Sequence, residues 1–484
     1  MNSPLESSLR NKVSKKTLYV NDCLQSVYFS HLECYDFIMK INLGYGTGTQ
    51  SAEVPEENII KTLSPNQVET STNTGADSVR EALAHPIGTP RLGEIVKPGE
   101  KIVIISSDIT RPMPTKVVLP VLLEELFAAG VRAEDVTLVL ALGSHRPHTD
   151  EERMRLAGDC VYGKGSGQVD SAASGQVTSA ASGQVGSATS GKILCIDSDP
   201  NDCIHLGTTT HGTPIDITRV VAEADRRISL GNIEYHYFAG YSGGIKAIFP
   251  GCSTPEAIQA NHSMMTNEKA CTGNLEDNPV RDDLEEAIAI CPTDFIINVV
   301  LNEKKEIIYT VAGDVIEAHR RGCEFLDKLY QVPIPAKADI VLVSQGGAPK
   351  DLNLYQTQKA LDNSKHAVKD GGTIILVGSC RERFGNKIFE EWITNAQKPS
   401  DLIQRVHEHF QLGGHKAAAI ALVQQKADIK LVSEMDDDTV RSIFMEPYDD
   451  LQKAVDDAFA KHGDQASVIV MPYGGSTLPV LEAK

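Results

Sequence analysis

The chain has 484 residues, enough for two or three domains that each bury a hydrophobic core, so it is no disulfide miniprotein. Its 46 Lys and Arg face 65 Asp and Glu, and the net charge of −19 argues against affinity for nucleic acid or anionic membranes, so an anionic substrate needs a local basic pocket. The ten cysteines form no CxxC pair, no secretory signal opens the chain, and no apolar run approaches the roughly 20 residues of a membrane span, which together predict a soluble cytoplasmic protein with reduced thiols.

Two segments differ in composition from the rest. Residues 1–38 have neither periodicity nor an apolar face, so we expect a disordered N-terminal extension, whereas MKINLGYG from Met39 predicts the first strand of a folded domain. Met39 is also a candidate for the natural start. Residues 166–191 contain three copies of an eight-residue unit rich in Ser, Gly and Ala, which bury too little surface to offset their ordering entropy. We expect a mobile loop inserted in a domain.

Two βαβ patterns predict an α/β fold with parallel or mixed sheets flanked by helices. In the first pattern, buried strands at 101–107 and 135–143 flank an amphipathic helix. In the second, strands at 338–344 and 372–378 flank a helix near 352–368. Ligands of open parallel sheets bind beyond the carboxyl ends of strands, so the residues that follow these strands are the first candidates for a site.

The first of these strands leads into SDITRPMP, which contains Asp108, Thr110 and Arg111. A carboxylate and a guanidinium beside a helix N-terminus suit a ligand that carries hydroxyl and phosphate or carboxylate groups. A surface ion pair explains the motif equally well. The tetrapeptide DITR recurs at Asp216–Arg219 without the prolines, so it is a weak signal by itself.

Three histidines lie in or after these segments. His145 follows the second strand, and a histidine at a strand end beside another candidate is a better prospect than an isolated one. His148 adjoins a predicted helix cap and is interpreted as part of that turn. His262 lies on a predicted helix, where an imidazole is more often structural, and no zinc-like spacing of other ligands accompanies it. A metal at His262 would take its remaining ligands from a small molecule.

The strongest local signal is GNIEYHYFAGYSGGIKAIFPG, residues 231–251. Gly243 and Gly244 remove side chains where the backbone turns sharply or approaches another group closely. Lys246 follows in apolar surroundings, which would lower the pKa of its amine and make it a nucleophile. A tight turn with a snorkelling lysine is the simpler explanation, but His236 and His262 nearby favour a functional site.

On the helix of the second pattern, Tyr355, Gln356 and Lys359 have spacings that present a phenol or amide beside an ammonium. This face suits a carboxylate, and a solvated helix face is an equal alternative. Two nucleotide motifs fail. GDCVYGKG at Gly158–Gly165 lacks the hydroxyl residue and the helix of a phosphate-binding loop. No GxGxxG occurs, so a nicotinamide dinucleotide site has no fingerprint.

Taken together, SSDITRPMP, LGSHRPHTDEE, GTPIDITRVVAEAD, YHYFAGYSGGIKAIFPG, ANHSMM and GGAPKDLNLYQTQKAL resemble the lactate racemase family, whose members use a nickel-pincer nucleotide. The resemblance covers about residues 39–484 in order, interrupted by the octapeptide repeat. It implies two α/β domains, which we place at residues 39–333 and 334–484, with the active site at their interface. PYGGSTLPV near the C-terminus is a candidate for returning to the first domain.

The resemblance also implies a tethered cofactor, pyridinium-3-thioamide-5-thiocarboxylic acid mononucleotide nickel, which many members join to a lysine through a thioamide. Lys246 matches that lysine, and His262 matches the protein ligand of nickel. His145 and His236 match the paired acid–base residues of the family. The other implied contacts are Asp108, Thr110, Arg111, Gly243 and Gly244 at the cofactor, and Arg111, Tyr355, Gln356 and Lys359 at the substrate.

The implied reaction is racemisation or epimerisation of a 2-hydroxy acid, lactate or a related acid. Its Cα proton is too weakly acidic for simple abstraction, so hydride transfer to an electrophilic cofactor is the easier route. One histidine takes the hydroxyl proton as the hydride leaves, giving a 2-keto acid, and the other supplies a proton when the hydride returns to the opposite face. The expected partners are a small 2-hydroxy acid and the enzymes that build the cofactor.

Two alternatives remain: an NAD-dependent 2-hydroxyacid dehydrogenase with a cryptic dinucleotide site, and a noncatalytic carrier of the same fold. The missing glycine fingerprint disfavours the first, and the intact histidines and Lys246 disfavour the second. The single tryptophan, Trp392, lies in IFEEWITNAQ, where no motif places it in a substrate pocket. A lactate-sized pocket is therefore not assumed.

Overall fold

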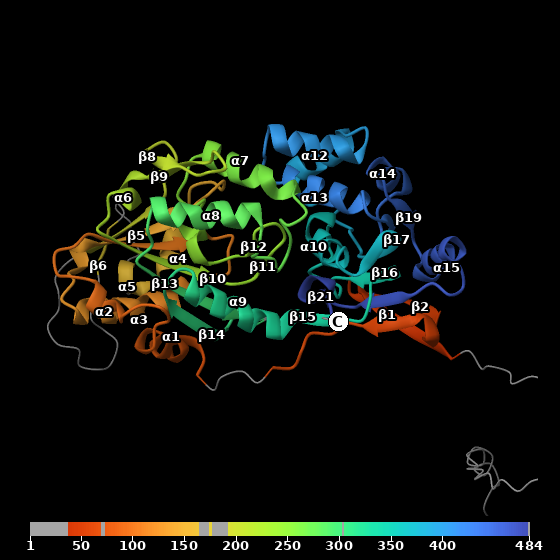
Figure 1. Ribbon diagram of the computed structural model, residues 1–484, viewed down its shortest axis with the longest axis horizontal. Helices are drawn as coiled ribbons and strands as arrows, with labels where there is room; N and C mark the ends of the chain where they lie inside the picture. The colour runs from red at the N-terminus through yellow and green to blue at the C-terminus, as the bar shows by residue number, and fades with distance from the viewer. Residues whose placement is uncertain (1–36, 69–72, 164–173, 177–191, 303, 483–484) are drawn as a thin grey trace, which may run out of the picture. The chain divides into compact units, whose positions relative to one another are not determined.

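Two β-sheets, each flanked by helices, organise the chain in the computed structural model (Figure 1). The structure describes residues 37–68, 73–163, 174–176, 192–302 and 304–482. The predicted α/β class is confirmed. Ile38–Lys484 form one compact unit, so both sheets belong to the same body.

The first sheet has seven strands in the order β14-β13-β10-β4-β5-β7-β6. The strands from β13 to β7 run parallel, and the edge strands β14 and β6 are antiparallel to their neighbours. The strand bounds are β4 (Ile102–Ser107), β5 (Val136–Ala141), β6 (Ser174–Gln176), β7 (Lys192–Asp197), β10 (Arg226–Asn232), β13 (Phe295–Leu301) and β14 (Ile307–Gly313). With α3 (Thr115–Ala128), strands β4 and β5 confirm the first predicted βαβ unit.

The second sheet has six strands, all parallel, in the order β19-β18-β17-β16-β20-β3. Their bounds are β3 (Ile59–Thr62), β16 (Ala338–Ser344), β17 (Val368–Val377), β18 (Asp428–Val432), β19 (Glu446–Tyr448) and β20 (Val468–Met471). Strands β16 and β17 with α10 (Leu354–Ser364) confirm the second predicted unit. Both faces of this sheet are covered, which is why β16 and β17 have continuous rather than alternating apolar runs.

The first strands of the folded chain pack on the second sheet. β1 (Ile38–Tyr45) confirms the strand predicted from Met39, and it pairs with β2 (Gly48–Pro55). The Ser344 hydroxyl donates to Gly44 O at 2.6 Å, and Gly46 N–H donates to Asp351 Oδ2 at 2.7 Å. We predicted these residues in the first domain; the apolar face of the hairpin instead covers the second sheet, beside which it lies in Figure 1.

The C-terminal strand touches elements of the other half. β21 (Leu478–Leu481) pairs in parallel with β15 (Gln331–Ile334). Leu478 packs against Gly273, since a Cβ added to this glycine would lie 2.6 Å from Leu478 Cδ2. These contacts agree with a return of the C-terminal segment, while the exact domain boundaries stay a prediction.

The remaining elements connect or cover the sheets. The helices of the first half are α1 (Gly75–Ala84), α2 (Leu92–Ile95), α4 (Asp150–Ala157), α5 (Asp159–Tyr162), α6 (Arg219–Ala222), α7 (Pro255–Ser263), α8 (Pro279–Ile290) and α9 (Glu317–Tyr330). Those of the second half are α11 (Lys387–Asn395), α12 (Pro399–Glu408), α13 (Gly414–Gln424), α14 (Asp437–Ser442) and α15 (Leu451–His462). Two hairpins complete the set, β8 (Cys203–Thr208) with β9 (Pro214–Thr218) and β11 (Tyr235–His236) with β12 (Gly240–Tyr241).

Two sequence predictions fall largely outside the described residues: the N-terminal extension, and most of the octapeptide repeat. Ser174–Gln176, inside the repeat, pair with β7 as an edge strand. An entirely irregular loop is therefore the wrong expectation for these three residues, because an open sheet edge offers unpaired backbone groups to any extended segment.

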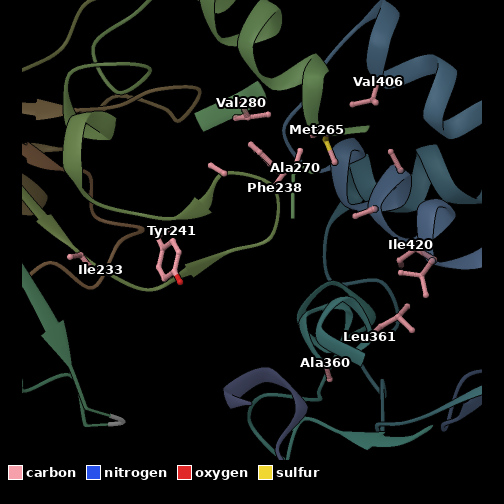
Figure 2. Packing of buried hydrophobic residues seen from close by; sticks show 14 of the residues in the cluster. Ile233, Phe238, Tyr241, Met265, Ala270, Val280, Ala360, Leu361, Val406 and Ile420 are labelled. Carbon is pink, nitrogen blue, oxygen red and sulfur yellow. The ribbon is translucent and has the colours of Figure 1, made fainter. Parts of the chain in front are cut away.

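One cluster of buried apolar side chains reaches across both halves of the molecule. Figure 2 shows Ile233 and Phe238 on loops of the first half, and Leu361 and Ile420 on α10 and α13. Helices α7 and α12 also meet in this region, where Gln259 Nε2 donates to Val406 O at 3.4 Å. The shared core holds the loops after the first sheet against α10 and α13. Within the described residues, no helix has the length and apolar character of a membrane span.

Candidate active site

A cavity of about 870 Å³ lies where loops after the first sheet meet α10 and α13. All the side chains and glycines singled out from the sequence line it: Asp108, Thr110, Arg111, His145, His236, Gly243, Gly244, Lys246, His262, Tyr355, Gln356 and Lys359. The carboxyl ends of β4, β5, β10 and β16 all open toward it, as expected for parallel sheets. The structure thus brings the predicted residues together, while their individual roles stay predictions.

His145 is held by the loop after β4. Its Nδ1 lies 2.8 Å from Asp108 Oδ2, and the side chains of Asp108 and His145 are 4% and 21% exposed. Thr110 donates to the other oxygen of Asp108 at 3.0 Å. Burial alone would raise the pKa of Asp108, but hydrogen bonds from His145 and Thr110 and the charge of Arg111 outweigh it and lower the pKa below its usual value. An ionised Asp108 keeps the His145 proton on Nδ1 and leaves Nε2 as a base.

His148 has a larger structural role than the turn position predicted for it. Its Nε2 accepts the backbone N–H of Ile109 at 3.0 Å, and its Nδ1 lies 2.7 Å from Asp197 Oδ1. Thr149 does cap α4, as predicted, with Glu152 completing a capping box. His148 therefore fixes the backbone between Asp108 and Thr110, a function that no local sequence pattern indicates.

The glycines of the 231–251 segment lie close to other parts of the protein. Gly243 and Gly244 have φ angles of +78° and +61°, a region that side chains disfavour. A Cβ on Gly243 would lie 2.7 Å from Asn298 Oδ1, and one on Gly244 would lie 3.1 Å from the His319 ring. Asn298 Oδ1 also accepts the Gly244 N–H at 2.8 Å. The close approach predicted for these glycines is thus to Asn298 and His319, although both glycines also line the cavity.

Lys246 lies in the short 3₁₀ helix that this turn creates, residues Gly244–Ala247. Arg281, fully buried at the start of α8, holds the preceding loop by donating to Ala239 O at 3.0 Å and to Tyr241 O. Burial, followed by the charges of Arg281 and Arg111, lowers the pKa of the Lys246 amine well below its usual value. A lower pKa increases the fraction of the neutral amine, which is the nucleophilic form.

His236 faces the cavity from β11. Its ring contacts Phe238 edge-on at 4.4 Å and stacks with Tyr237 at 5.6 Å between ring centres. Burial and the charges of Lys246 and Arg111 hold the pKa of His236 well below 6.5, so the ring is neutral. Its Nδ1 accepts the Ala239 N–H at 3.3 Å, which places the single proton on Nε2. His236 and His145 therefore present opposite tautomers to the cavity.

His262 lies in the last turn of α7, and Thr254 caps the N-terminus of this helix. Its Nδ1 lies 2.8 Å from Asn261 Oδ1, and the Asn261 amide in turn donates to Asp283 at 2.7 Å. An Nδ1–H fixed in this way leaves the Nε2 lone pair available, which is the usual arrangement of a histidine that binds a metal. Burial and the charge of Lys246 also lower the pKa of His262 well below 6.5, which favours the neutral, ligating form.

The cavity is basic although the protein is acidic. Its walls include six Lys or Arg side chains and three Asp or Glu side chains: Arg111, Lys246, Lys305, Lys350, Lys359 and Lys416 against Asp108, Glu234 and Asp362. Such an excess of cations attracts an anionic ligand. The local basic pocket that the net charge required is therefore present.

The sequence reasoning missed several residues on the cavity wall. Lys416, at the start of α13, donates to Tyr355 O at 2.6 Å and lies 4.0 Å from the centre of the Tyr355 ring. Burial and the neighbouring Lys359 lower the pKa of Lys416 to about 7. Tyr237 and Gln358 also line the cavity. A signal for Lys416 was available, because it precedes the apolar run AAAIALV much as Lys246 lies among apolar residues.

Trp392 does not line the cavity, in agreement with its sequence context. It is fully buried on α11, donates to Gln411 Oε1 at 3.0 Å and lies 4.2 Å from the guanidinium of Arg405. A Cβ on Gly414 would clash with its ring, so Trp392 supports the start of α13 from behind. Its influence on the cavity is through the position of that helix.

Two family models match the chain. The model described as the lactate racemase N-terminal domain matches residues 45–273, and the model described as the lactate racemase C-terminal domain matches residues 334–478. Two curated lactate racemases are similar over 90% of this chain. The one from Lactiplantibacillus plantarum is 32% identical over 99% of its own length, and the one from Thermoanaerobacterium thermosaccharolyticum is 30% identical over 98%.

Solved structures are similar as well. The lactate racemase apoprotein from Thermoanaerobacterium thermosaccharolyticum matches with a TM-score of 0.75 at 30% identity and covers 92% of this chain and 100% of its own. A protein from Thermotoga maritima matches with a TM-score of 0.53 at 19% identity, over 86% of this chain and 100% of its own, and shares the fold alone.

Proposed function

The chain belongs to the lactate racemase family, which confirms the resemblance in its motifs, and we propose that it racemises or epimerises a 2-hydroxy acid with a nickel-pincer nucleotide. The relatives are named for an isomerase, which supports the predicted enzyme class. The observation that carries the proposal is that four residues from separate motifs line one cavity: His145, His236, Lys246 and His262.

The residues present fit such a cofactor. The lowered pKa of Lys246 favours the nucleophilic form of its amine, which a thioamide link requires, and His262 offers Nε2 because its Nδ1 is engaged by Asn261. Among the described residues, no three His, Cys, Asp or Glu side chains are grouped to hold a metal, so nickel at His262 would take its other ligands from the cofactor. When bound, the nickel-pincer nucleotide supplies a reversible hydride acceptor.

The two histidines handle the hydroxyl proton. His145 accepts it at Nε2, and Asp108 stabilises the resulting imidazolium through Nδ1–H. His236 is the base for the opposite enantiomer. Before its Nε2 can accept a proton, the 3.3 Å hydrogen bond from the Ala239 N–H to Nδ1 must break and the ring proton must move from Nε2 to Nδ1. In each turnover one histidine accepts the hydroxyl proton. The other histidine, which must enter the turnover as an imidazolium, donates a proton to the oxygen as the hydride returns, and proton exchange with water that enters the cavity restores both.

The carboxylate of the substrate fits the cationic side of the cavity. Arg111 approaches from the first half, and Lys359 with Gln356 from α10. Lys416 adds a further ammonium beside these residues, and a hydrogen bond to Tyr355 O holds it in place. The bidentate geometry of a guanidinium suits a carboxylate, and a lysine supplies a compact second charge. Together they orient C2 of the acid between the two histidines.

The first test is intact mass and nickel content of protein co-expressed with cofactor-building enzymes, followed by a racemisation assay on lactate and related acids. We expect a mass increment on the Lys246 peptide, bound nickel and racemisation, with activity lost in His145→Ala and His236→Ala. Nickel without an increment supports a cofactor held noncovalently. Absence of nickel, increment and racemisation would refute the proposal in favour of a noncatalytic carrier.

A further inference from the structure

Two polar side chains at the cavity wall have no use in the reaction described above. Gln358, on α10, is 1% exposed, and neither its Nε2 nor its Oε1 has a hydrogen-bond partner among the residues that the structure describes. The Tyr237 hydroxyl is likewise buried and unpaired within that part of the chain. Unpaired buried amides and hydroxyls are costly and uncommon in native proteins, so each calls for a specific explanation. A ligand that completes their hydrogen bonds is such an explanation.

Both groups line the same cavity. Gln358, Lys359 and Asp362 follow Tyr355 by three, four and seven residues, so the four residues share one face of α10, and all of them line the cavity. Tyr237 stacks on His415 with 5.9 Å between ring centres, and the next residue, Lys416, donates to Tyr355 O on α10. Tyr237 therefore packs on the part of α13 that contacts α10.

We propose that Gln358 and Tyr237 bind a hydroxyl group on the side chain of the 2-hydroxy acid, beyond carbon 2. This inference rests on the proposed function and specifies its substrate class. An amide offers donors and an acceptor, a phenol offers one of each, and an alcohol both donates and accepts. One substrate hydroxyl therefore pairs with both side chains. A methyl group, as in lactate, leaves all three protein atoms unpaired.

A second carboxylate fits this place less well. It has no proton to donate, so Gln358 Oε1 would stay unpaired. Asp362, one turn further along the same face, is already engaged by Thr272 at 3.1 Å and by Lys365 at 2.8 Å, and it adds a negative charge at this end. The cations Arg111 and Lys359 are committed to the carboxylate at carbon 1. The site accordingly selects a neutral hydroxyl over an anionic substituent.

The test compares kcat/KM of the nickel-loaded enzyme for 2,3-dihydroxypropanoate, lactate and 2-hydroxysuccinate. We expect the dihydroxy acid to be preferred over both others by at least about tenfold, since a site built to bind a hydroxyl rejects analogues that lack it. Gln358→Leu should remove most of this preference by raising KM for the dihydroxy acid much more than KM for lactate. Tyr237→Phe, which keeps the ring, should act in the same direction.

Gln424→Leu is the matched control. Gln424 is a partly buried glutamine at the end of α13 that does not line the cavity; its Nε2 donates to Ile443 O at 2.9 Å, and its buried Oε1 has no partner among the described residues. This substitution should change thermal stability but leave the substrate preference intact. Circular dichroism and nickel content of each variant show whether it folds and loads.

Three results overturn the inference: equal or lower kcat/KM for the dihydroxy acid in the unsubstituted enzyme, a preference for 2-hydroxysuccinate, or loss of nickel in Gln358→Leu, which would assign the amide to the cofactor. A nickel-loaded enzyme that racemises none of the acids refutes the proposed function instead. Calorimetry then decides the inference separately. Binding of the dihydroxy acid that weakens at least tenfold in Gln358→Leu supports it, and equal binding to both proteins overturns it.

Discussion

Replacing Asp108 by Asn tests whether His145 depends on a carboxylate. The substitution keeps the size of the side chain but removes its charge. Asp108 Oδ2 lies 2.8 Å from His145 Nδ1, the geometry of a charge-assisted hydrogen bond. Asp108 is buried, so solvent does little to replace the lost carboxylate when His145 becomes an imidazolium. The variant should therefore lose activity without losing its fold.

The size of the effect follows from the bond. A hydrogen bond to a charged group contributes about 1.5–3 kcal/mol, and about 1.4 kcal/mol corresponds to a tenfold change in rate. The loss predicts a fall in kcat of about 10- to 150-fold. If the Asn amide turns its NH₂ toward Nδ1, the proton moves to Nε2 and the base is lost, which in a comparable catalytic histidine lowers kcat by about 10⁴-fold.

The assay is the initial rate of racemisation by nickel-loaded protein across pH, with nickel content measured in parallel. The second copy of DITR provides the control, because Asp216 also pairs with a histidine, His205, at 2.7 Å. His205 is 58% exposed and Asp216 22%, so Asp216→Asn should leave kcat unchanged and cost at most about 1 kcal/mol of stability. A kcat within threefold of the parent in fully loaded Asp108→Asn would refute the assigned role.

Three further predictions concern the cofactor and the basic side of the cavity. His262→Ala should lose bound nickel but keep the covalent mass increment, and nickel retained in this variant would show that His262 is not the nickel ligand. Lys246→Ala should lose the mass increment, and an increment retained in this variant would show that Lys246 is not the point of attachment. Lys416 has a pKa lowered from 10.5 to about 7, so it costs stability at pH below 7, and this cost fades as pH rises toward 10.5. The difference in Tm between Lys416→Met and the parent should therefore favour the variant more at pH 6 than at pH 10, as scanning calorimetry can measure; no pH dependence in that difference would contradict the buried ammonium.

The fold was predictable where the sequence carries a strong periodic signal. The strands around Ile104 and Leu342 are long apolar runs next to amphipathic helices, and such runs specify parallel strands through local chemistry alone. The placement of β1 to β3 was not predictable in this way. Which sheet an edge strand joins depends on long-range contacts, here Ser344 with Gly44 and Asp351 with Gly46, over separations of about 300 residues.

Some residues of the candidate site were likewise predictable from local sequence, and others were not. Residues such as Lys246 and His145 stand out because local sequence predicts an unusual position for them, an amine in an apolar run and an imidazole at a strand end. Gln358 and Tyr237 have no such local mark. Their interest comes from the lack of partners for their polar atoms among the described residues, a property of the surrounding packing that only the assembled structure displays.

The two DITR segments illustrate how position in the fold decides function. Each places an aspartate against a histidine, so the local chemistry is the same. The first segment follows β4, a central strand whose carboxyl end opens into the cavity, and its histidine comes from the end of the neighbouring β5. The second lies at the end of the β8–β9 hairpin, which is a separate two-stranded sheet, and His205 comes from the same hairpin. Asp216 also accepts from Thr254, the cap of α7, at 3.3 Å, so this pair stabilises local structure. The pair of Asp108 and His145 instead joins two adjacent strand ends and orients an imidazole at the cavity wall.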